Sequence, residues 1–362
     1  METDGLKLSV YLGERDRHGG GLLSDVLMDI YTRGGVRAAA LLRGAEGFGL
    51  RHRVQTERLL TLSEDLPVLA VAVDARERIL ALLEEVQSVS PHGLITLERA
   101  RLLEGAAIPP GRAASGRAAA GDLSGSRPGA SEDFHQLTIF GARGDRLGGL
   151  PAHIVVVDML HSRGFSGASA LLGVDGAVAG TRRRARLLGG NAEVPLLMTA
   201  IGSQGQIAGA LPELQAMLGR RPMTLERVRV CKRDGVLLAD PSLRPSTDSE
   251  GRPHWQKLVV QTGEQDRHER RPIHAALVRR LRRVGAAGAT ALRAQWGYGG
   301  EHAPHGERFS SIGRRAPVLT VVLDTPENML RWFPIIDEMT ARTGLVTSEV
   351  VPVRGRAAPL PR

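Results

Sequence analysis

One motif recurs three times in this chain and limits the folds that it can adopt. Each copy is a short strand of alternating apolar residues followed by an Asp-Arg pair: Asp16-Arg17, Asp145-Arg146 and Asp266-Arg267. Successive copies lie about 120 to 130 residues apart, which is too long for a solenoid unit of roughly 20 to 50 residues. It is the length of a small domain with its linker. The 362-residue chain is therefore predicted to hold three related domains in tandem.

Composition separates the repeats from the segments between them. Residues 105–133 and 236–254 are rich in Gly, Ala, Ser and Pro, as is typical of flexible linkers. The predicted division is repeat 1 at 1–104, a linker at 105–133, repeat 2 at 134–235, a linker at 236–254, repeat 3 at 255–354 and a tail at 355–362. Repeat 2 is the most diverged of the three.

The apolar pattern within repeat 1 predicts the order strand, helix, strand, strand, helix, strand. Alternation indicates strands near 7–12, 36–43, 68–73 and 94–103, and an i, i+4, i+8 stripe indicates a first helix that ends at Gly34-Gly35. This order is that of the ferredoxin-like split unit. We therefore expect an α+β protein in which three sheets, each with helices on one face only, pack their open faces around a pseudo-threefold axis.

The second helix of each repeat gives an internal check. Its apolar stripe of Ile79, Leu82, Leu83 and Val86 recurs in both other repeats. Each copy is also preceded by an N-capping pattern, which is Asp74 with Glu77, Ser203 with Gln206, and Asp324 with Glu327.

Composition excludes several classes of function. The net charge is +9, but with 3% aromatic residues the arginines are not interleaved with stacking side chains, so we expect no nucleic-acid interface. Cys231 is the single cysteine, which excludes a disulfide framework and favours a small apolar filler on a strand. No secretory signal or long apolar run is visible. The expectation is a cytoplasmic protein without membrane insertion.

Three segments of repeat 1 resemble a known family. They are KLSVYLGERDR (7–17), GVRAAALLRGAEGFG (35–49) and LSEDLPVLAVAVDARERILALLEEV (62–86). They resemble the PII-like family catalogued as domain of unknown function 190, which is similar to the PII signalling proteins. PII proteins are ferredoxin-like trimers that bind adenine nucleotides in clefts between subunits. A triple copy then suggests a trimer fused into one monomeric polypeptide.

The resemblance implies a regulator of a protein partner, such as a membrane transporter or channel. Its effector would be a small anion, an adenine nucleotide being the possible one, and no cofactor is certain. PII proteins begin their mobile loop with Gly-Phe-Gly, whereas repeat 2 has Gly176-Ala177-Val178 there. The segment 88–93 has no Lys and one Gly, unlike the phosphate loop of PII proteins. The candidate ligand-binding residues are Asp16, Arg17, Arg43, Gly44, Glu46, Gly47, Phe48, Gly49, Asp145, Arg146, Asp266, Arg267, Arg293, Gly297, Tyr298 and Gly299.

Several alternatives stay open. The Asp-Arg pairs either order a loop, as an ion pair or hydrogen bond, or offer a guanidinium fork to phosphate or carboxylate. The basic loop residues at 51–53, 58 and 182–186 are either solvated or dock an acidic partner or a phospholipid surface. His302 and His305, flanked by Glu301 and Glu307, form the one metal-like cluster, and we predict no metal site there.

No catalytic motif is present, so an enzyme is not expected. The competing functions are a ligand-independent adaptor that docks through its arginine-rich loops, and an enzyme with an unrecognised site. Because the three copies have diverged, we expect the three clefts to differ and one of them to be inactive.

Overall fold

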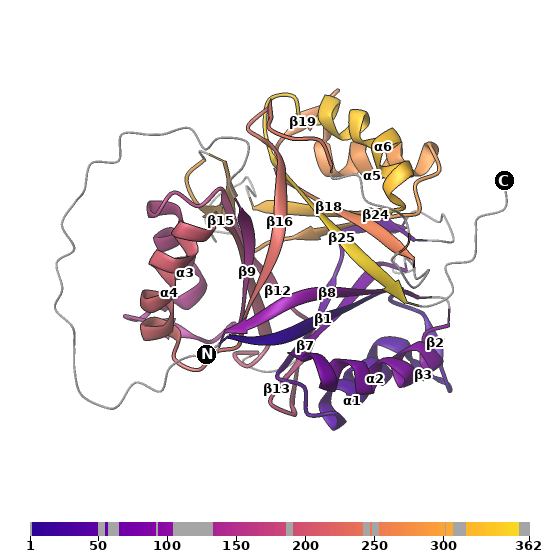
Figure 1. Ribbon diagram of the computed structural model, residues 1–362, viewed down its shortest axis with the longest axis vertical. Helices are drawn as coiled ribbons and strands as arrows, with labels where there is room; N and C mark the ends of the chain where they lie inside the picture. The colour runs from indigo at the N-terminus through magenta and orange to yellow at the C-terminus, as the bar shows by residue number, and fades with distance from the viewer. Residues whose placement is uncertain are drawn as a thin grey trace.

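The computed structural model describes residues 2–49, 55–56, 65–91, 93–103, 133–185, 191–241, 247, 253–300, 302–306 and 316–354. Each repeat forms its own four-stranded antiparallel sheet with two helices on one face. The helix pairs lie on the outside of the molecule and the long strands lie towards its centre (Figure 1). Within the described residues, no helix is long and apolar enough to cross a membrane.

The same six long elements occur in the same order in each repeat. Those of repeat 1 are β1 (Glu2–Gly13), α1 (Leu23–Arg33), β4 (Ala38–Arg43), β7 (Pro67–Ala75), α2 (Arg76–Val89) and β8 (Leu94–Leu103). Those of repeat 2 are β9 (Phe134–Ala142), α3 (Ala152–Ser162), β12 (Gly167–Leu172), β15 (Pro195–Ser203), α4 (Gln204–Leu218) and β16 (Met223–Arg233). Those of repeat 3 are β18 (His254–Gly263), α5 (Ile273–Arg283), β21 (Gly288–Arg293), β24 (Pro317–Asp324), α6 (Pro326–Met339) and β25 (Leu345–Arg354).

Short strands complete the molecule. They are β2 (Arg17–His18), β3 (Gly21–Leu22), β5 (Glu46–Phe48), β6 (Gln55–Thr56), β10 (Arg146–Leu147), β11 (Leu150–Pro151), β13 (Asp175–Val178), β14 (Thr181–Arg184), β17 (Val236–Leu237), β19 (Arg267–His268), β20 (Arg271–Pro272), β22 (Trp296–Gly299) and β23 (His305–Gly306). β2–β3, β10–β11 and β19–β20 are small hairpins between the first strand and first helix of each repeat.

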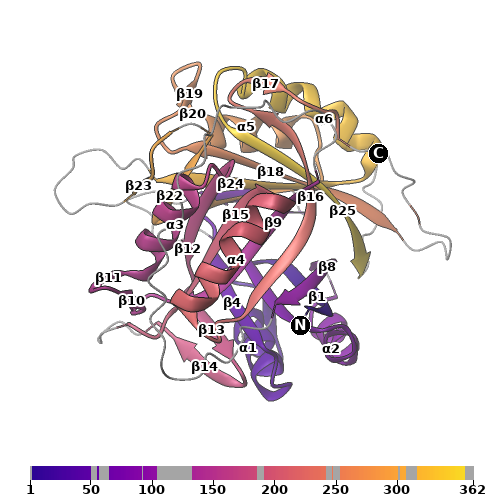
Figure 2. The ribbon, with the colours of Figure 1, turned by 60° about the vertical axis from the view of Figure 1, so that its left-hand side comes forward.

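The strand order is identical in the three sheets. In repeat 1 it is β8-β1-β7-β4, all antiparallel, and the equivalent orders are β16-β9-β15-β12 and β25-β18-β24-β21. The predicted order of elements is therefore confirmed in every repeat. Figure 2 shows that the helices of each repeat cover only its outer face.

The apolar stripes of the second helices point inward as predicted. Ile79 and Val86 of α2 are fully buried, and Leu82 and Leu83 pack beside them at the edge of the same core. The equivalent positions of α4 and α6 belong to the cores of repeats 2 and 3. Three copies of one stripe thus produce three separate cores between helices and sheet.

The predicted N-cap is confirmed in only one of the three second helices. Ser203 caps α4 with Gln206 in a reciprocal capping box. In α2 and α6 the N-cap residue is the next one along the chain, Ala75 and Thr325. Asp74 and Asp324 instead accept a hydrogen bond from a backbone amide just before the second strand, at 2.9 and 3.0 Å. Because these carboxylates bond to the segment before the second strand, they do not cap the second helix.

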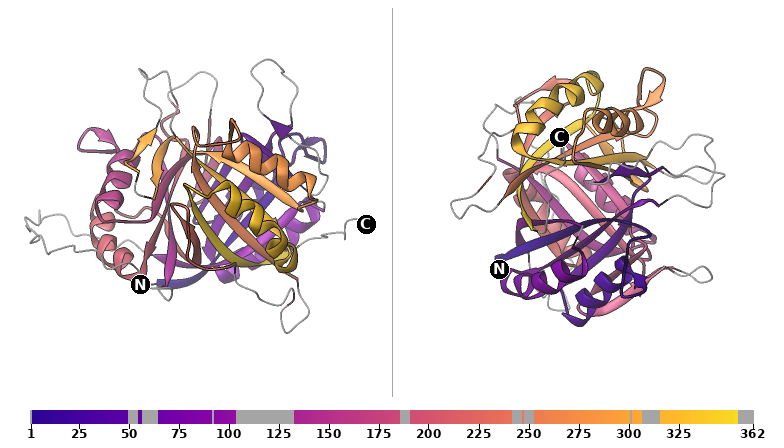
Figure 3. Two further views of the ribbon diagram at one scale, coloured as in Figure 1. Left: turned by 90° about the horizontal axis from the view of Figure 1, so that it is seen from above. Right: turned by 90° about the vertical axis from the view of Figure 1, so that its right-hand side faces the viewer.

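The last strands of the three sheets join in a cycle. The C-terminal part of β8 pairs with the start of β16, that of β16 with the start of β25, and that of β25 with the start of β8. The three sheets therefore surround one central region, which Figure 3 shows from two further directions. A fourth apolar cluster there takes residues from all three repeats. The open faces of the sheets thus cover one another, as the sequence predicted.

Candidate functional site

The aspartate of each Asp-Arg motif orders a turn. The Oδ2 atoms of Asp16, Asp145 and Asp266 accept hydrogen bonds from the backbone N–H three residues earlier, at 2.8, 2.8 and 2.7 Å. The backbone C=O of the same residues accepts from the first residue of the following helix. Each aspartate therefore fixes the path from the first strand to the first helix. For the aspartates, these contacts correspond to the alternative in which the Asp-Arg pair orders a loop.

The arginine of each motif has a different environment. Arg17, Arg146 and Arg267 are exposed in all three repeats. Their guanidinium groups donate to backbone carbonyls of the same turn, at 3.1, 3.2 and 2.8 Å. Among the described residues, none of the three forms an ion pair with a carboxylate. The motif thus consists of a half-buried aspartate with a structural role and an exposed cationic arginine.

A second set of contacts connects each repeat to the edge of the next. β5 of repeat 1 pairs with β21 of repeat 3, β13 of repeat 2 pairs with β4 of repeat 1, and β22 of repeat 3 pairs with β12 of repeat 2. We call these contacts the β5–β21, β13–β4 and β22–β12 junctions. Each added strand begins the long segment that follows the second strand of its repeat. The residues compared with Gly-Phe-Gly of PII proteins lie in these junctions.

The first glycine of that motif is required by close approach of two backbones. A Cβ atom on Gly47 would lie 2.6 Å from the carbonyl oxygen of Ala289 in repeat 3. The equivalent distances at Gly176 and Gly297, to carbonyl oxygens of the neighbouring repeat, are 2.5 and 2.3 Å. Real Cβ atoms do not approach so closely, so the strands could not pair with a side chain there. This explains why repeat 2 keeps this glycine although it has lost the second.

The residue after that glycine packs into the core of the neighbouring repeat. Phe48 is 2% exposed and lies among the core residues of repeat 3. Tyr298 is fully buried in the core of repeat 2, where its hydroxyl donates to the carbonyl of Phe165 at 3.2 Å. Ala177 occupies the same place in repeat 1. These residues are therefore buried between two repeats, whereas the PII resemblance compares them with the start of a mobile loop.

The residue before the glycine forms a different polar contact in each junction. In the β5–β21 junction, Oε1 of Glu46 lies 3.9 Å from Nε of Arg279 on α5 and has no hydrogen-bond donor among the described residues. Burial raises the pKa of Glu46 to about 7, and Arg279 opposes this rise. In the β22–β12 junction the same position is Trp296, whose Nε1–H donates to Asp158 at 3.3 Å.

The β13–β4 junction is held by an ion-pair network. Arg182 of β14 donates to Asp175 from Nε at 3.0 Å. The same guanidinium reaches Asp25 on α1 at 3.1 Å and contacts Asp29 one turn later. Arg182 thus bridges carboxylates of repeats 1 and 2. Arg182, in the arginine-rich loop of repeat 2, is therefore engaged in an internal contact. Residues 50–54, 57–64 and 186–190 of the basic loops lie outside the described residues.

The end of the second strand carries a further pair in two repeats. Arg43 contacts Glu14 and Arg293 contacts Glu264, both at 2.9 Å. In repeat 2 the equivalent residues are Leu172 and Arg143, so this pair cannot form. Gly44 follows Arg43 and donates its N–H to Pro67 at 2.7 Å. Gly49 is exposed beyond β5, and Gly299 ends β22.

Two histidines behind these junctions are held neutral. Burial and the nearby Arg293 and Arg267 lower the pKa of His274, on α5, to about 4. Burial and Arg146 also lower the pKa of His153 on α3. The His302 and His305 side chains each bond to a backbone carbonyl, and the flanking Glu301 and Glu307 lie outside the described residues. No cluster of metal-binding side chains occurs within the described part of the chain. Burial raises the pKa of Cys231 to about 12, in keeping with an apolar filler.

A buried polar ring that the sequence did not lead us to expect lies at the centre of the molecule. In each repeat a residue of the first strand lies directly opposite a glutamate of the last strand: Lys7 with Glu98, Gln136 with Glu226, and Lys257 with Glu349. We call these six residues the central ring. Lys7 and Lys257 are 7% and 6% exposed. A signal was available, because the chain has three lysines and two of them interrupt these apolar strands.

The central ring links repeats as well as strands. Nζ of Lys7 lies 2.6 Å from Glu98 of its own repeat and 2.9 Å from Glu226 of repeat 2. Nζ of Lys257 lies 2.6 Å from Glu349 and 2.8 Å from Glu98 of repeat 1. Despite burial, Lys257 and Lys7 hold the pKa of Glu98 down to about 2. Ionised pairs thus connect all three repeats at the centre.

Comparison with known proteins finds the same three units. The family DUF190, described as "Uncharacterized ACR, COG1993", matches residues 5–102, 134–230 and 255–353. A UPF0166 protein of Aquifex aeolicus is 32% identical over 96 residues, which are 23% of this chain and all of that protein. UPF0166 protein MJ1524 of Methanocaldococcus jannaschii is 31% identical over 99 residues, 27% of this chain and 91% of that protein. These relatives have about the length of one repeat.

Among solved structures, an aspartate kinase from Synechocystis matches with a TM-score of 0.25 and 11% identity. The match covers 97% of this chain and 52% of that one, so this chain spans about half the length of the kinase. At that TM-score the match carries no argument about fold or function. The three family matches together cover most of the 362 residues, and the chain belongs to the DUF190 family as three tandem copies.

Proposed function

We propose that this protein is a PII-like regulator that binds a small anionic ligand at the junctions between its repeats. Its fold would be a ferredoxin-like single-chain pseudo-trimer with the domain boundaries given above. It would act in the cytoplasm as a regulator and not as a catalyst. An adenine nucleotide is the effector that the PII resemblance suggests, and a membrane transporter or channel is the corresponding class of partner.

The observation that carries this proposal is the environment of Arg17, Arg146 and Arg267. Each guanidinium is exposed and, among the described residues, bonded only to backbone carbonyls, while the adjacent aspartate holds the turn in place. A planar guanidinium with free N–H groups is suited to bidentate contact with phosphate or carboxylate. A fixed turn presents it without a large loss of conformational entropy on binding.

The junctions offer a physical route from such a ligand to a partner. Each junction strand is followed directly by the long segment of its repeat, and Arg43 and Arg293 stand where the second strand gives way to it. A ligand that binds more tightly when the segment has one conformation will shift the population of that conformation. Ordering of a loop in this way is a common switching mechanism.

The experiment is a thermal-shift screen of the whole chain against adenine, guanine and cyclic nucleotides and against small anions. A ligand at 100 times its Kd adds about 2.7 kcal/mol of stability. The unfolding entropy grows with chain length, and for a chain of this length the added stability corresponds to a rise in Tm of about 3 to 4 °C. A flat response to every compound would contradict the proposal.

A triple variant then tests the site. Arg17→Ala, Arg146→Ala and Arg267→Ala together should abolish the shift and leave the unliganded Tm unchanged, because the three side chains are exposed. The matched control replaces three other exposed arginines, Arg99, Arg280 and Arg331, and should keep the full shift. If both triple variants retain the shift, the ligand binds elsewhere.

The second candidate function is a ligand-independent adaptor. Arg183 and Arg184 of β14 are exposed beside Arg182, and this is the observation that favours this function. Both also contact carboxylates of the chain, Arg183 that of Glu193 and Arg184 that of Asp25. An adaptor should keep its partner when the three motif arginines are replaced and lose it when Arg183 and Arg184 are replaced. A regulator should lose its ligand response with the motif arginines.

A further inference from the structure

The two lysines of the central ring form the same pattern of contacts. Each ammonium contacts the glutamate of its own repeat and the glutamate of the next repeat around the cycle. Lys7 thus joins repeats 1 and 2, and Lys257 joins repeats 3 and 1. Gln136 occupies the third position, where the same pattern places a group between Glu226 of repeat 2 and Glu349 of repeat 3. Its amide donates to Glu226 at 2.9 Å.

Two of the three ring carboxylates are fully provided with donors. Glu98 accepts from both lysines and from the hydroxyls of Ser9 and Thr96, at 2.6 to 3.1 Å. Glu226 accepts from Lys7, Gln136, Thr138 and Thr224. Four donors per carboxylate are what a buried ionised group needs to offset its desolvation.

Glu349 differs from both. Within the described residues, Lys257 is the one group in direct ion-pair or hydrogen-bond contact with it, at 2.6 Å. The residue equivalent to Ser9 and Thr138 is Val259, which has no hydroxyl group, and the residue equivalent to the third lysine is Gln136. Two independent substitutions have therefore removed donors from the same carboxyl group, which is 10% exposed.

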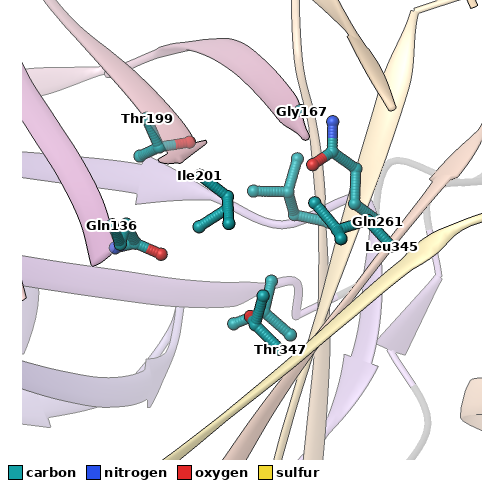
Figure 4. Close-up of a pocket in the computed structure, with 9 residues that line it drawn as sticks. Gln136, Gly167, Thr199, Ile201, Gln261, Leu345 and Thr347 are labelled. Carbon is teal, nitrogen blue, oxygen red and sulfur yellow. The ribbon is translucent and has the colours of Figure 1, made fainter. Parts of the chain in front are cut away.

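A small cavity lies beside Gln136. It has a volume of about 10 Å³, roughly the space of one water molecule, and both Gln136 and Val259 line it. Figure 4 shows Gln136 on one side of the cavity and Thr347 and Leu345 of β25, the strand of Glu349, on another. The cavity thus adjoins both positions at which repeat 3 and repeat 2 have lost a donor, although Glu349 itself does not line it.

The charges of the ring do not balance when every group is ionised. Three carboxylates face two ammonium groups, which leaves one negative charge at the centre of the molecule. The titratable groups that face Glu349 are Lys257 on β18, Glu98 on β8, Lys7 on β1, Glu226 on β16 and, beside them, Tyr11. An uncompensated buried charge costs several kcal/mol, and a buried carboxyl avoids that cost by taking up a proton.

We propose that Glu349 is a proton-binding site, so that the central ring of the native protein holds one proton at neutral pH in place of a third ammonium group. Burial raises the pKa of Glu349, Lys257 opposes the rise and Glu98 adds to it, which agrees with this assignment. Glu98, which has four donors, stays ionised.

The bound proton connects pH to the closure of the three repeats. A carboxyl whose pKa is higher in the folded than in the unfolded chain binds its proton on folding. Its contribution to stability is complete below the ordinary glutamate pKa of about 4.3 and is lost as pH rises towards the folded pKa. Release of the proton places a net charge where β8, β16 and β25 meet, so alkaline pH should weaken the contacts between repeats.

The test is infrared spectroscopy of the whole chain at pH 7, where a protonated carboxylic acid has a carbonyl stretch distinct from that of a carboxylate. Every protein compared carries Glu46→Gln, because Glu46, whose pKa is raised to about 7, would otherwise contribute the same band. In this background the protein with an unchanged central ring should show the band, and the addition of Glu349→Gln should remove it. Gln136→Lys, which completes the ring with a third ammonium, should also lack it. Glu85→Gln, at an exposed glutamate of α2, is the matched control and should keep the band.

A second measurement uses denaturant unfolding as a function of pH. Above pH 4.3, the folding equilibrium constant of the wild type should fall by up to tenfold per pH unit relative to Glu349→Gln, the effect of one proton. Gln136→Lys should remove most of that fall. In the Glu46→Gln background, the absence of a protonated band from the unchanged ring, or its persistence in Glu349→Gln, would overturn the proposal. Parallel pH profiles for wild type and Glu349→Gln would overturn it too. If Gln136→Lys does not fold, Glu349→Gln still decides the question.

Discussion

Replacement of Phe48 by alanine should destabilise a repeat other than the one that contains it. Phe48 belongs to repeat 1 in sequence, but its ring is 98% buried in the core of repeat 3, between α5 and the sheet. Truncation of a buried phenylalanine costs about 3 to 5 kcal/mol. If the 362 residues unfold as one unit, a loss of 4 kcal/mol lowers Tm by about 5 °C. If repeat 3 unfolds alone, the same loss lowers its midpoint by about 16 °C or more.

Hydrogen exchange of Phe48→Ala locates the effect. Amides of α5 and β21 should exchange faster in the variant, and those of α1 should change little, because the cavity opens beneath α5. Gly49→Ala is the matched control, since a Cβ at Gly49 meets nothing within 4 Å and the position is exposed. Loss of protection confined to α1 and β4 would refute the assignment of Phe48 to the core of repeat 3.

Three further perturbations test separate parts of the structure. Gly47→Ala forces a Cβ to within 2.6 Å of the Ala289 carbonyl oxygen, so the free energy of unfolding measured with denaturant should fall by about 1 to 3 kcal/mol. An unchanged midpoint would exclude the β5–β21 pairing. Lys7→Met removes the buried cation that contacts Glu98 and Glu226, and should lower the free energy of unfolding by about 3 to 5 kcal/mol. A decrease below about 1 kcal/mol would show that the central ring is hydrated. Glu46, whose pKa is raised to about 7, binds a proton on folding. The stability of the wild type should therefore fall relative to that of Glu46→Gln as pH rises from about 4.3 to 7, and identical pH profiles would show that Glu46 is in contact with water.

The sequence predicted the repeated unit because its signals are local. Strand alternation, the helix stripe through Ile79 and Val86, and the glycine stop at Gly35, which has a φ of +61°, all act within about a dozen residues. Each signal also occurs three times, so one copy checks another. The order of elements, the three outer cores and the closure of the open sheet faces were therefore accessible without a structure.

The contacts between repeats were harder to predict, because they join residues that are distant in the chain. Gly47 and Phe48 suggested a mobile loop, since a glycine beside an aromatic residue carries no information about a strand edge some 240 residues away. The N-cap assignments at Asp74 and Asp324 failed for a related reason. The carboxylates are engaged by amides of a preceding element, Arg37 and Ala287, which a local capping pattern does not include.

The central ring could have been found from the lysines. In a chain with three lysines, Lys7 and Lys257 interrupt apolar strands at equivalent positions, and a buried cation requires a buried anion. The matching glutamates Glu98, Glu226 and Glu349 also recur at equivalent places in the last strands. Their partnership across repeats depends on the cyclic arrangement, however, and that arrangement is a tertiary property.

The three junctions are not interchangeable. Glu46 faces Arg279, Asp175 is bridged through Arg182 to Asp29, and Trp296 bonds to Asp158. Exchange of one repeat for another would bring unmatched groups together, such as Glu46 against Asp29. A fused chain can hold three different interfaces, whereas a symmetric trimer of identical subunits must repeat one. The divergence of the copies therefore specifies the order in which they assemble.

The measurement that tests the central claim most directly is the mass of the particle in solution by sedimentation equilibrium. Closure of the three repeats on one another within a single polypeptide predicts the mass of one chain, 38.8 kDa, at all concentrations that can be measured. A particle of three chains, in which each repeat pairs with copies from other polypeptides, would contradict the closed arrangement described here.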